Sequence, residues 1–227
     1  MKKIDEFFQK YADRLVWVFI SAYIVIFSCL CFMKYRSFHY FDWDLASDAV
    51  VLWNSVHGRM LYYPFLDGSI FGAHIYLIAF LVMPLYAVFQ TPLLLLFLQS
   101  FFLGMAAYPL YLIARSKLGK SFALVIAAAY LFYPPLGNTN LFETHFETYA
   151  VFFLFFALYY FEAEKFWKFL VFALLAVSCK ENIGAAIFMI GVYGLVRRRS
   201  ARWTLRDGLL RRQPGTHQPA SRSSWMR

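Results

Sequence analysis

Long apolar runs separated by short polar segments dominate the hydrophobic pattern of the chain. The runs occupy 15–33, 75–89, 93–114, 121–136, 146–161, 166–178 and 183–196. Several of them approach the roughly 20 residues that a helix needs to cross about 30 Å of hydrocarbon. The composition agrees, because 61% of the 227 residues are hydrophobic and only 15% are charged. The pattern therefore predicts an all-α, polytopic transmembrane helix bundle.

The run at 75–89 decides how the chain is threaded through the membrane. It is short and contains Pro84. If it is a re-entrant or interfacial helix, the basic loop at 115–120 lies on the same side as the basic N-terminus, and Lys and Arg prefer cytoplasmic loops. The sequence therefore predicts about six spans, a cytoplasmic N-terminus and a first outer loop at 34–92. The protein is expected in the cell (plasma or inner) membrane.

The net charge of +9 is concentrated in the last part of the chain. Residues 197–227 hold nine arginines and one acid, Asp207, whereas residues 1–196 carry thirteen basic and twelve acidic side chains. The charge therefore gives no reason to expect a nucleic-acid partner. We expect a cytoplasmic N-terminus at 1–14, a membrane module at 15–196 and a basic tail at 197–227 that is disordered or frame-altered, with a genuine cytoplasmic tail as the alternative.

Lys180 and Glu181 interrupt an apolar stretch that runs from 166 to 196. A single helix over this stretch would be about 46 Å long, which exceeds the hydrocarbon core. Placing both charges at the membrane centre would cost roughly 5–7 kcal/mol. Two short helices joined by a turn on the outer side avoid this cost. We expect Lys180 to lie near Glu181 or a carboxylate of the 143–147 loop, since an unpaired lysine there is unfavourable.

Residues 44–58 show the spacing of an amphipathic helix on the outer surface. Asp44 is a candidate N-cap and Gly58 a candidate stop. Asp44 and Asp48 are four residues apart and are expected to share a face that points away from lipid. A capping role alone would also explain Asp44. The apolar face is expected to contain Leu45, Ala49, Leu52, Trp53 and Val56.

Glu143, His145 and Glu147 occupy alternate positions just before an apolar run. In an extended loop their side chains would point the same way, which suits a divalent ion or a phosphate-bound metal. A solvated loop explains the spacing equally well. The sequence has no G-x-S-x-G, HExxH, Walker or GxGxxG motif, and its three cysteines form no disulfide or metal pattern.

Several segments in a fixed order carry a family resemblance. They are "FDWDLASDAVVLWNSVHGR", "GAHIYLIAFLVMPLYAVFQTPLLLLFLQS", "YPLYLIARSKLG", "NLFETHFE" and "CKENIG". Over about 33–196 the chain resembles a polytopic membrane family catalogued as domain of unknown function 2079. That family is similar to the GT-C glycosyltransferases, which take a sugar from a polyprenyl-phosphate carrier at the outer face of the membrane.

The resemblance implies roles for individual residues. Asp44 would act as catalytic base or metal ligand, with Asp48 assisting it. The phosphate-binding residues would be Lys180, His74 and Arg59, and a divalent metal, Mg²⁺ or Mn²⁺, would be held by Glu143, His145, Glu147 and Glu181. The chain departs from the family at Phe146, where proline is usual, and at Asn182, where an acid is usual. GT-C enzymes have more spans, so a truncation or reading-frame change near 196 is expected.

Two classes of function follow from these features. The first is a GT-C-like membrane glycosyltransferase, or the N-terminal part of one, which acts on a polyprenyl-phosphate sugar donor in the bilayer. The second is a transporter or channel component, or a non-catalytic membrane subunit. Transporters tend to show internal repeats and binding groups at the midplane. No repeat is evident here, and the ionisable residues gather on the predicted outer side.

Overall fold

The computed structural model describes residues 2–40 and 43–196. The basic tail predicted at 197–227 lies outside these residues. Helices dominate the described chain, so the all-α prediction is confirmed. The strands found within the described residues are β1 (Tyr62–Tyr63) and β2 (Gly68–Ser69), an antiparallel pair in which Tyr62 faces Ser69.

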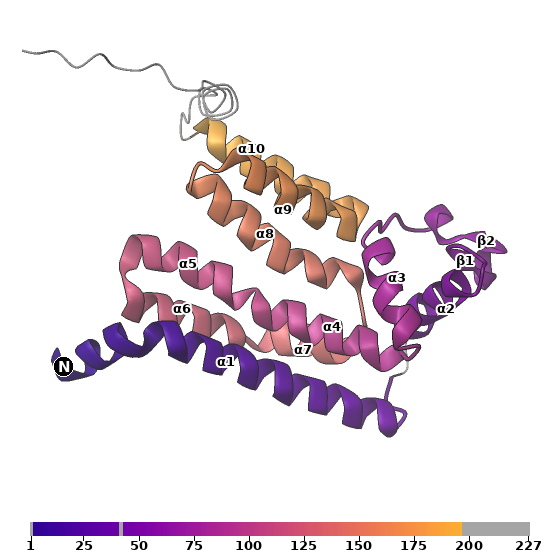
Figure 1. Cartoon of the computed structure of the whole chain (residues 1–227), viewed down its shortest axis with the longest axis horizontal. Helices are drawn as coiled ribbons and strands as arrows, with labels where there is room; N and C mark the ends of the chain where they lie inside the picture. The colour runs from indigo at the N-terminus through magenta and orange to yellow at the C-terminus, as the bar shows by residue number, and fades with distance from the viewer. Residues whose placement is uncertain (1, 41–42, 197–227) are drawn as a thin grey trace, which may run out of the picture.

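The helices follow one another with short connections. In chain order they are α1 (Lys2–Arg36), α2 (Asp44–Val56), α3 (Ala79–Val88), α4 (Pro92–Met105), α5 (Ala107–Leu118), α6 (Lys120–Leu131), α7 (Pro134–Phe142), α8 (Phe146–Glu162), α9 (Phe166–Cys179) and α10 (Gly184–Val196). Three short 3₁₀ turns are η1 (Pro64–Leu66), η2 (Ile70–Gly72) and η3 (Glu181–Ile183). The long helices run side by side, and α2, α3 and the hairpin cluster at one end of them (Figure 1).

Two helical stretches of the described chain are long and apolar enough to cross a membrane. They are Glu6–Arg36 and Pro92–Leu118, and α6 with α7 adds a third if this pair, bent by 42°, counts as one span. The 14 residues of α9 measure only about 21 Å, and α10 is shorter still. Length and composition therefore support two or three spans. The 10 residues of α3, about 15 Å long, are too few to cross alone, as the prediction for 75–89 requires.

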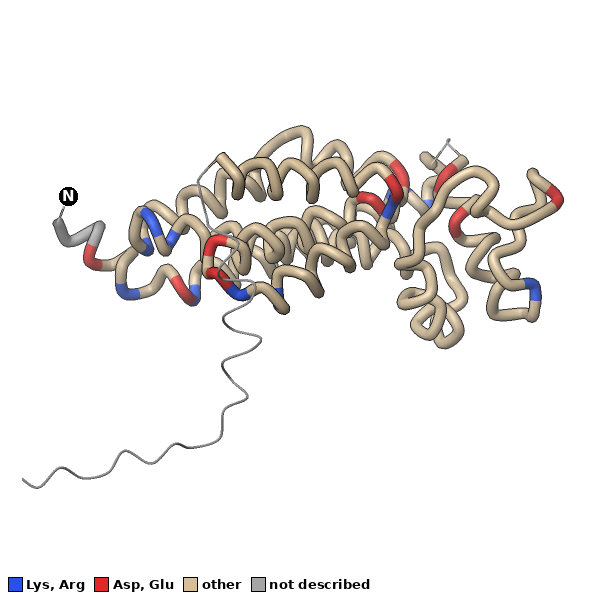
Figure 2. Tube along the Cα trace, turned by 90° about the horizontal axis from the view of Figure 1, so that it is seen from above, with Lys and Arg blue, Asp and Glu red and all other residues tan. Residues whose placement is uncertain are grey.

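Charged residues gather at the two ends of the bundle and leave its middle uncharged (Figure 2). At the end opposite α2, the Asp13 carboxylate on α1 accepts hydrogen bonds from Tyr111 (2.7 Å), Arg115 (2.7 Å) and Lys120 (2.6 Å). Lys117 also donates to Glu162 at 2.9 Å. These bonds join α1, α5, α6 and α8 at one level. An apolar belt between two charged rims is the arrangement that a bilayer imposes on a helical bundle.

The helices pack through small residues at their contacts. A Cβ atom on Gly104 of α4 would lie 2.7 Å from Cγ1 of Ile24 on α1, so only a glycine permits this close approach of the two helices. One buried cluster joins α1 to α4, α5, α6 and α7, with Val16 and Tyr111 at its centre. A second buried cluster, which contains Leu95 of α4 and Tyr149 of α8, packs α2, α3, α4, α8 and α9 together.

Candidate functional site

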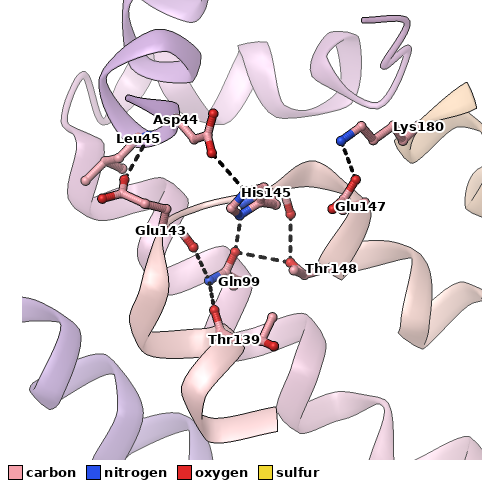
Figure 3. Close-up of polar contacts among 9 residues, drawn as sticks. All are labelled: Asp44, Leu45, Gln99, Thr139, Glu143, His145, Glu147, Thr148 and Lys180. Atoms are coloured by element: carbon pink, nitrogen blue, oxygen red, sulfur yellow. Dashed lines mark hydrogen bonds and ion pairs between the residues drawn. The ribbon is translucent and has the colours of Figure 1, made fainter. Parts of the chain in front are cut away.

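A polar pocket of about 240 Å³ lies at the end of the bundle that carries α2. Four separate segments meet there: the start of α2, the chain before α3, the α7–α8 connection and the break between α9 and α10 (Figure 3). We call it the central pocket. Its lining residues are Asp44, Asp48, His74, Tyr76, Thr144, His145, Phe146, Glu147, Cys179 and Lys180.

Asp44 faces His145 across the central pocket. The prediction that Asp44 is the N-cap of α2 is wrong, because Asp44 is the first helical residue. Trp43 occupies the N-cap position, and its side chain makes no capping hydrogen bond. Its Oδ2 atom lies 2.9 Å from Nε2 of His145. The Asp44 side chain is half exposed. The predicted stop is confirmed, because α2 ends at Val56 and Gly58 adopts a φ of +89°.

Asp48 lies one helical turn further on and occupies a different environment. It is 9% exposed and lies beside Tyr76. Burial and then the neighbouring charge of Asp44 raise the pKa of Asp48 well above its usual range. The two aspartates therefore share a face, as predicted, but burial disfavours the ionised form of Asp48.

The predicted apolar face of α2 is buried at Leu45, Ala49 and Leu52, but the buried surface is wider than predicted. Asp48, Asn54 and Ser55 are buried, whereas Trp53 is half exposed. The reason is that α2 packs on α3, α4 and β1 rather than lying alone on a surface. Asn54 donates to the carbonyl oxygen of Tyr62, and Ser55 accepts from the N–H of Leu61, so both polar side chains find partners.

The break at Lys180 is confirmed. Helix α9 ends at Cys179, Lys180 has an extended backbone with φ −166°, and η3 leads into α10. The Lys180 ammonium forms an ion pair with Glu147 in the first turn of α8. The expected partner from the 143–147 loop is therefore present. Glu147 also benefits from its place near a helix N-terminus, where negative charge is favoured.

His74 and Glu181 form a second pair at the edge of the central pocket. Glu181 lies 3.3 Å from Nδ1 of His74 and accepts the N–H of Ile75 at 3.0 Å. Backbone N–H groups of Glu181 itself and of Ile75 lower the pKa of the Glu181 carboxyl. Nearby, the N–H of Ile78 donates to the carbonyl oxygen of Ser178 at 2.7 Å. The segment at 74–78 is thus attached to the end of α9.

Gln99 on α4 holds the α7–α8 connection in place, and the sequence analysis did not identify it. Its side chain is fully buried. Its amide donates to the carbonyl oxygen of Glu143 at 2.7 Å, and its Oε1 accepts from the N–H of His145 at 2.9 Å and from the Thr148 hydroxyl at 3.2 Å. A glutamine inside a long apolar run was the available signal, because a buried amide requires several partners.

The four residues predicted as metal ligands do not come together as one group. Glu143 is buried and accepts from the N–H of Leu45 at 3.0 Å. His145, Glu147 and Glu181 each face a different partner, as described above. The physical reason is that α8 begins at Phe146, so the three alternate positions do not lie on one extended segment whose side chains all point the same way. No group of three or more His, Cys, Asp or Glu residues that could hold a metal occurs in the described part of the chain.

Two of the three residues predicted to bind phosphate line the central pocket, namely Lys180 and His74. Arg59 does not. Its guanidinium lies over the ring of Tyr62, 4.6 Å from the ring centroid, after the end of α2. The structure therefore brings together Asp44, Asp48, His145, Glu147, Lys180 and His74 from the predicted residues.

The family model described as "Predicted membrane protein (DUF2079)" matches residues 34–212. The chain belongs to this family. No curated protein and no solved structure matches the chain. The matched segment of this DUF2079 protein contains every residue of the central pocket, and it excludes most of α1. It also extends past Val196 into the basic tail.

Proposed function

We propose that this DUF2079 protein is a GT-C-like membrane glycosyltransferase, or the N-terminal part of one. It would transfer a sugar from a polyprenyl-phosphate carrier at the outer face of the membrane. The observation that carries this proposal is the central pocket, in which the Asp44 carboxylate and the Lys180 ammonium face one cavity at the end of an apolar helical bundle. A lipid-linked phosphate requires a site in which a cation binds the phosphate while the lipid chain stays in the adjacent hydrocarbon.

The reaction assigns a separate task to each side of the central pocket. Asp44, held by His145, would take the proton from an acceptor hydroxyl while the hydroxyl oxygen attacks the anomeric carbon of the sugar. The bond from that carbon to the phosphate oxygen breaks, and the phosphate leaves with the electron pair. Lys180 would stabilise the charge that develops on the leaving phosphate, and His74 would add a hydrogen bond. The sugar is transferred with inversion.

The membrane arrangement proposed with this activity has about six spans and a cytoplasmic N-terminus in the cell membrane. The basic residues Arg115, Lys117 and Lys120 lie around the α5–α6 connection, at the end of the bundle opposite α2 (Figure 1), and such residues favour the cytoplasm. Helices α8, α9 and α10 would then cross as short spans. Their outer ends reach the hydrated central pocket rather than a full hydrocarbon thickness, which supports crossing by helices of this length.

A divalent cation, Mg²⁺ or Mn²⁺, stays a separate proposal. Carboxylates that line the central pocket, Asp44 and Glu147, have the oxygen ligands that such ions prefer. The proposed reaction uses Asp44 and Lys180 and does not require the ion in any step. Transfer assays with and without a chelator would show whether an ion is required.

The test of this proposal is sugar transfer by the full chain in membranes supplied with radiolabelled polyprenyl-phosphate sugars. Asp44→Asn keeps the size of the side chain but removes the charge, and it should lower the rate by at least about 10²-fold. Asp67→Asn is the matched control, because Asp67 accepts from the Tyr62 hydroxyl at 2.8 Å and does not line the central pocket. Absence of transfer by the unmodified chain, or full activity of Asp44→Asn, would contradict the proposal.

A further inference from the structure

A second pocket of about 370 Å³ adjoins the central pocket on the side of α7. We call it the α7 pocket. It shares His145 and Glu147 with the central pocket. Its lining residues are Asn138, Thr139, Phe142, His145, Glu147 and Thr148. His145 and Glu147 therefore stand at the boundary between two cavities.

The lining of the α7 pocket combines a flat aromatic surface with several hydrogen-bonding groups. The Phe142 side chain is 52% exposed, and its ring lies nearly parallel to that of His145, at 17° and 6.1 Å between centroids. Asn138 supplies an amide, Thr139 a hydroxyl and Glu147 a carboxylate. A pyranose ring matches both features, because its hydroxyls need donors and acceptors and its C–H face is attracted to the negative face of an aromatic ring.

The walls of the α7 pocket are fixed by contacts outside it. The Lys34 ammonium on α1 donates to the carbonyl oxygens of Leu141 and Phe142, at 2.6 and 3.2 Å, and so holds the last turn of α7. A cation at a helix C-terminus is also favoured by the helix dipole. From the other side, Gln99 accepts from Thr148 and donates to the carbonyl oxygen of Thr139. The pocket is therefore formed before any ligand arrives, which reduces the entropic cost of binding.

We propose that the α7 pocket binds the acceptor, a saccharide whose hydroxyl reaches the Asp44–His145 pair. This inference rests on the proposed function and deepens it by dividing the site between two substrates. The donor phosphate lies at Lys180 in the central pocket, and the acceptor sugar stacks on Phe142 with its hydroxyls at Asn138 and Glu147. The two meet at His145, which lines both pockets.

Saccharide binding can be measured without sugar transfer. The probes are methyl glycosides of common pyranoses, and the readout is saturation-transfer NMR on the purified full chain in nanodiscs free of sugar-based detergent. At least one glycoside should bind, and Phe142→Ala and Asn138→Ala should each raise its Kd at least about tenfold, equivalent to about 1.4 kcal/mol. Phe132→Ala is the matched control, because Phe132 is 79% exposed and lies outside the α7 pocket.

A conservative variant separates loss of binding from loss of folding. Phe142→Tyr keeps the aromatic face, so it should retain binding within about threefold, whereas Phe142→Leu keeps bulk without the ring and should not. Absence of binding by the unmodified chain for every glycoside, or unchanged binding in Phe142→Ala and Asn138→Ala, would overturn the inference. If the chain binds a glycoside but shows no transfer activity, saccharide binding by the α7 pocket is supported and only the proposed function is contradicted.

Discussion

Asp44 begins α2 and His145 lies in the α7–α8 connection, far away in the sequence, yet their side chains lie 2.9 Å apart. His145 is held independently, because its N–H donates to the buried Gln99 side chain. The pair therefore has a defined orientation at the boundary of two pockets. We expect His145→Ala to lower sugar transfer about 10–100-fold, as loss of an orienting partner typically does, with little change in donor KM. His57→Ala is the control, since His57 stacks on Trp53 at the surface. Equal rates for the two variants would show that the pair is structural.

Lys180 is expected to act on the donor. Lys180→Ala should raise the donor KM and lower kcat, by at least about 10²-fold in kcat/KM, because the leaving phosphate loses its cation. Lys168→Ala, at an exposed position over Tyr160, should have no effect. Lys180→Ala also leaves Glu147 without its partner, which can destabilise the protein. The double variant with Glu147→Gln restores the balance of charge, so a recovered Tm together with a donor KM that stays high would assign the loss to phosphate binding.

The buried position of Asp48 predicts a dependence of stability on pH. Its pKa is raised in the folded state, so its contribution to stability is fully present below the unfolded value near 3.8 and is lost as the pH rises through the folded pKa. Asp48→Asn cannot ionise. We therefore expect it to raise Tm at pH 7.5 and to leave Tm at pH 4 nearly unchanged, measured by thermal unfolding in detergent. An equal shift at both pH values would contradict this.

Replacing Gln99 should destabilise the protein, although Gln99 has no role in the proposed chemistry. Gln99→Leu is close in size but leaves the N–H of His145 and the carbonyl of Glu143 without their partner. Each buried group left unsatisfied costs about 1–3 kcal/mol. The variant should lower Tm and disorder the loop that carries His145. Gln90→Leu is the control, because Gln90 is exposed and its amide makes a 3.4 Å bond to Ala87. A variant as stable as the control would show that other contacts suffice.

The proposed topology can be examined by labelling cysteines in intact cells. Ser69→Cys, in the hairpin near the central pocket, should react with an impermeant thiol reagent added outside. Ser116→Cys, exposed at the opposite end of the bundle, should react only after the membrane is opened. Both are made in a background without Cys29, Cys31 and Cys179. Labelling of Ser116→Cys in intact cells would reverse the orientation.

Features that depend on the cost of burying charge were predictable from the sequence. The break at Lys180 and its pairing with a carboxylate follow from that cost, but the choice of Glu147 over Glu181 does not. The end of α2 at Gly58 follows from the backbone freedom of glycine. Asp44 and Asp48 were expected on one face because they are four residues apart.

Features that depend on distant partners were not predictable. Gln99 contacts residues more than forty positions away, and no local pattern shows which carbonyls it will reach. The expected grouping of Glu143, His145 and Glu147 assumed an extended loop, and the start of α8 changes the direction of the last side chain. Burial of Asp48 depends on α3 and α4 covering α2.

The attachment of the 74–78 segment to the end of α9 has a mechanical consequence. Because Ile78 bonds to Ser178 and His74 lies beside Glu181, the wall that carries His74 is tied to the break between α9 and α10. The opposite wall holds Asp44 of α2 and His145 of the α7–α8 connection. The ion pair of Lys180 with Glu147 joins the two walls. A phosphate that takes Lys180 as its partner competes with Glu147 for it, so arrival of the donor would exchange this bond across the central pocket for one to the substrate.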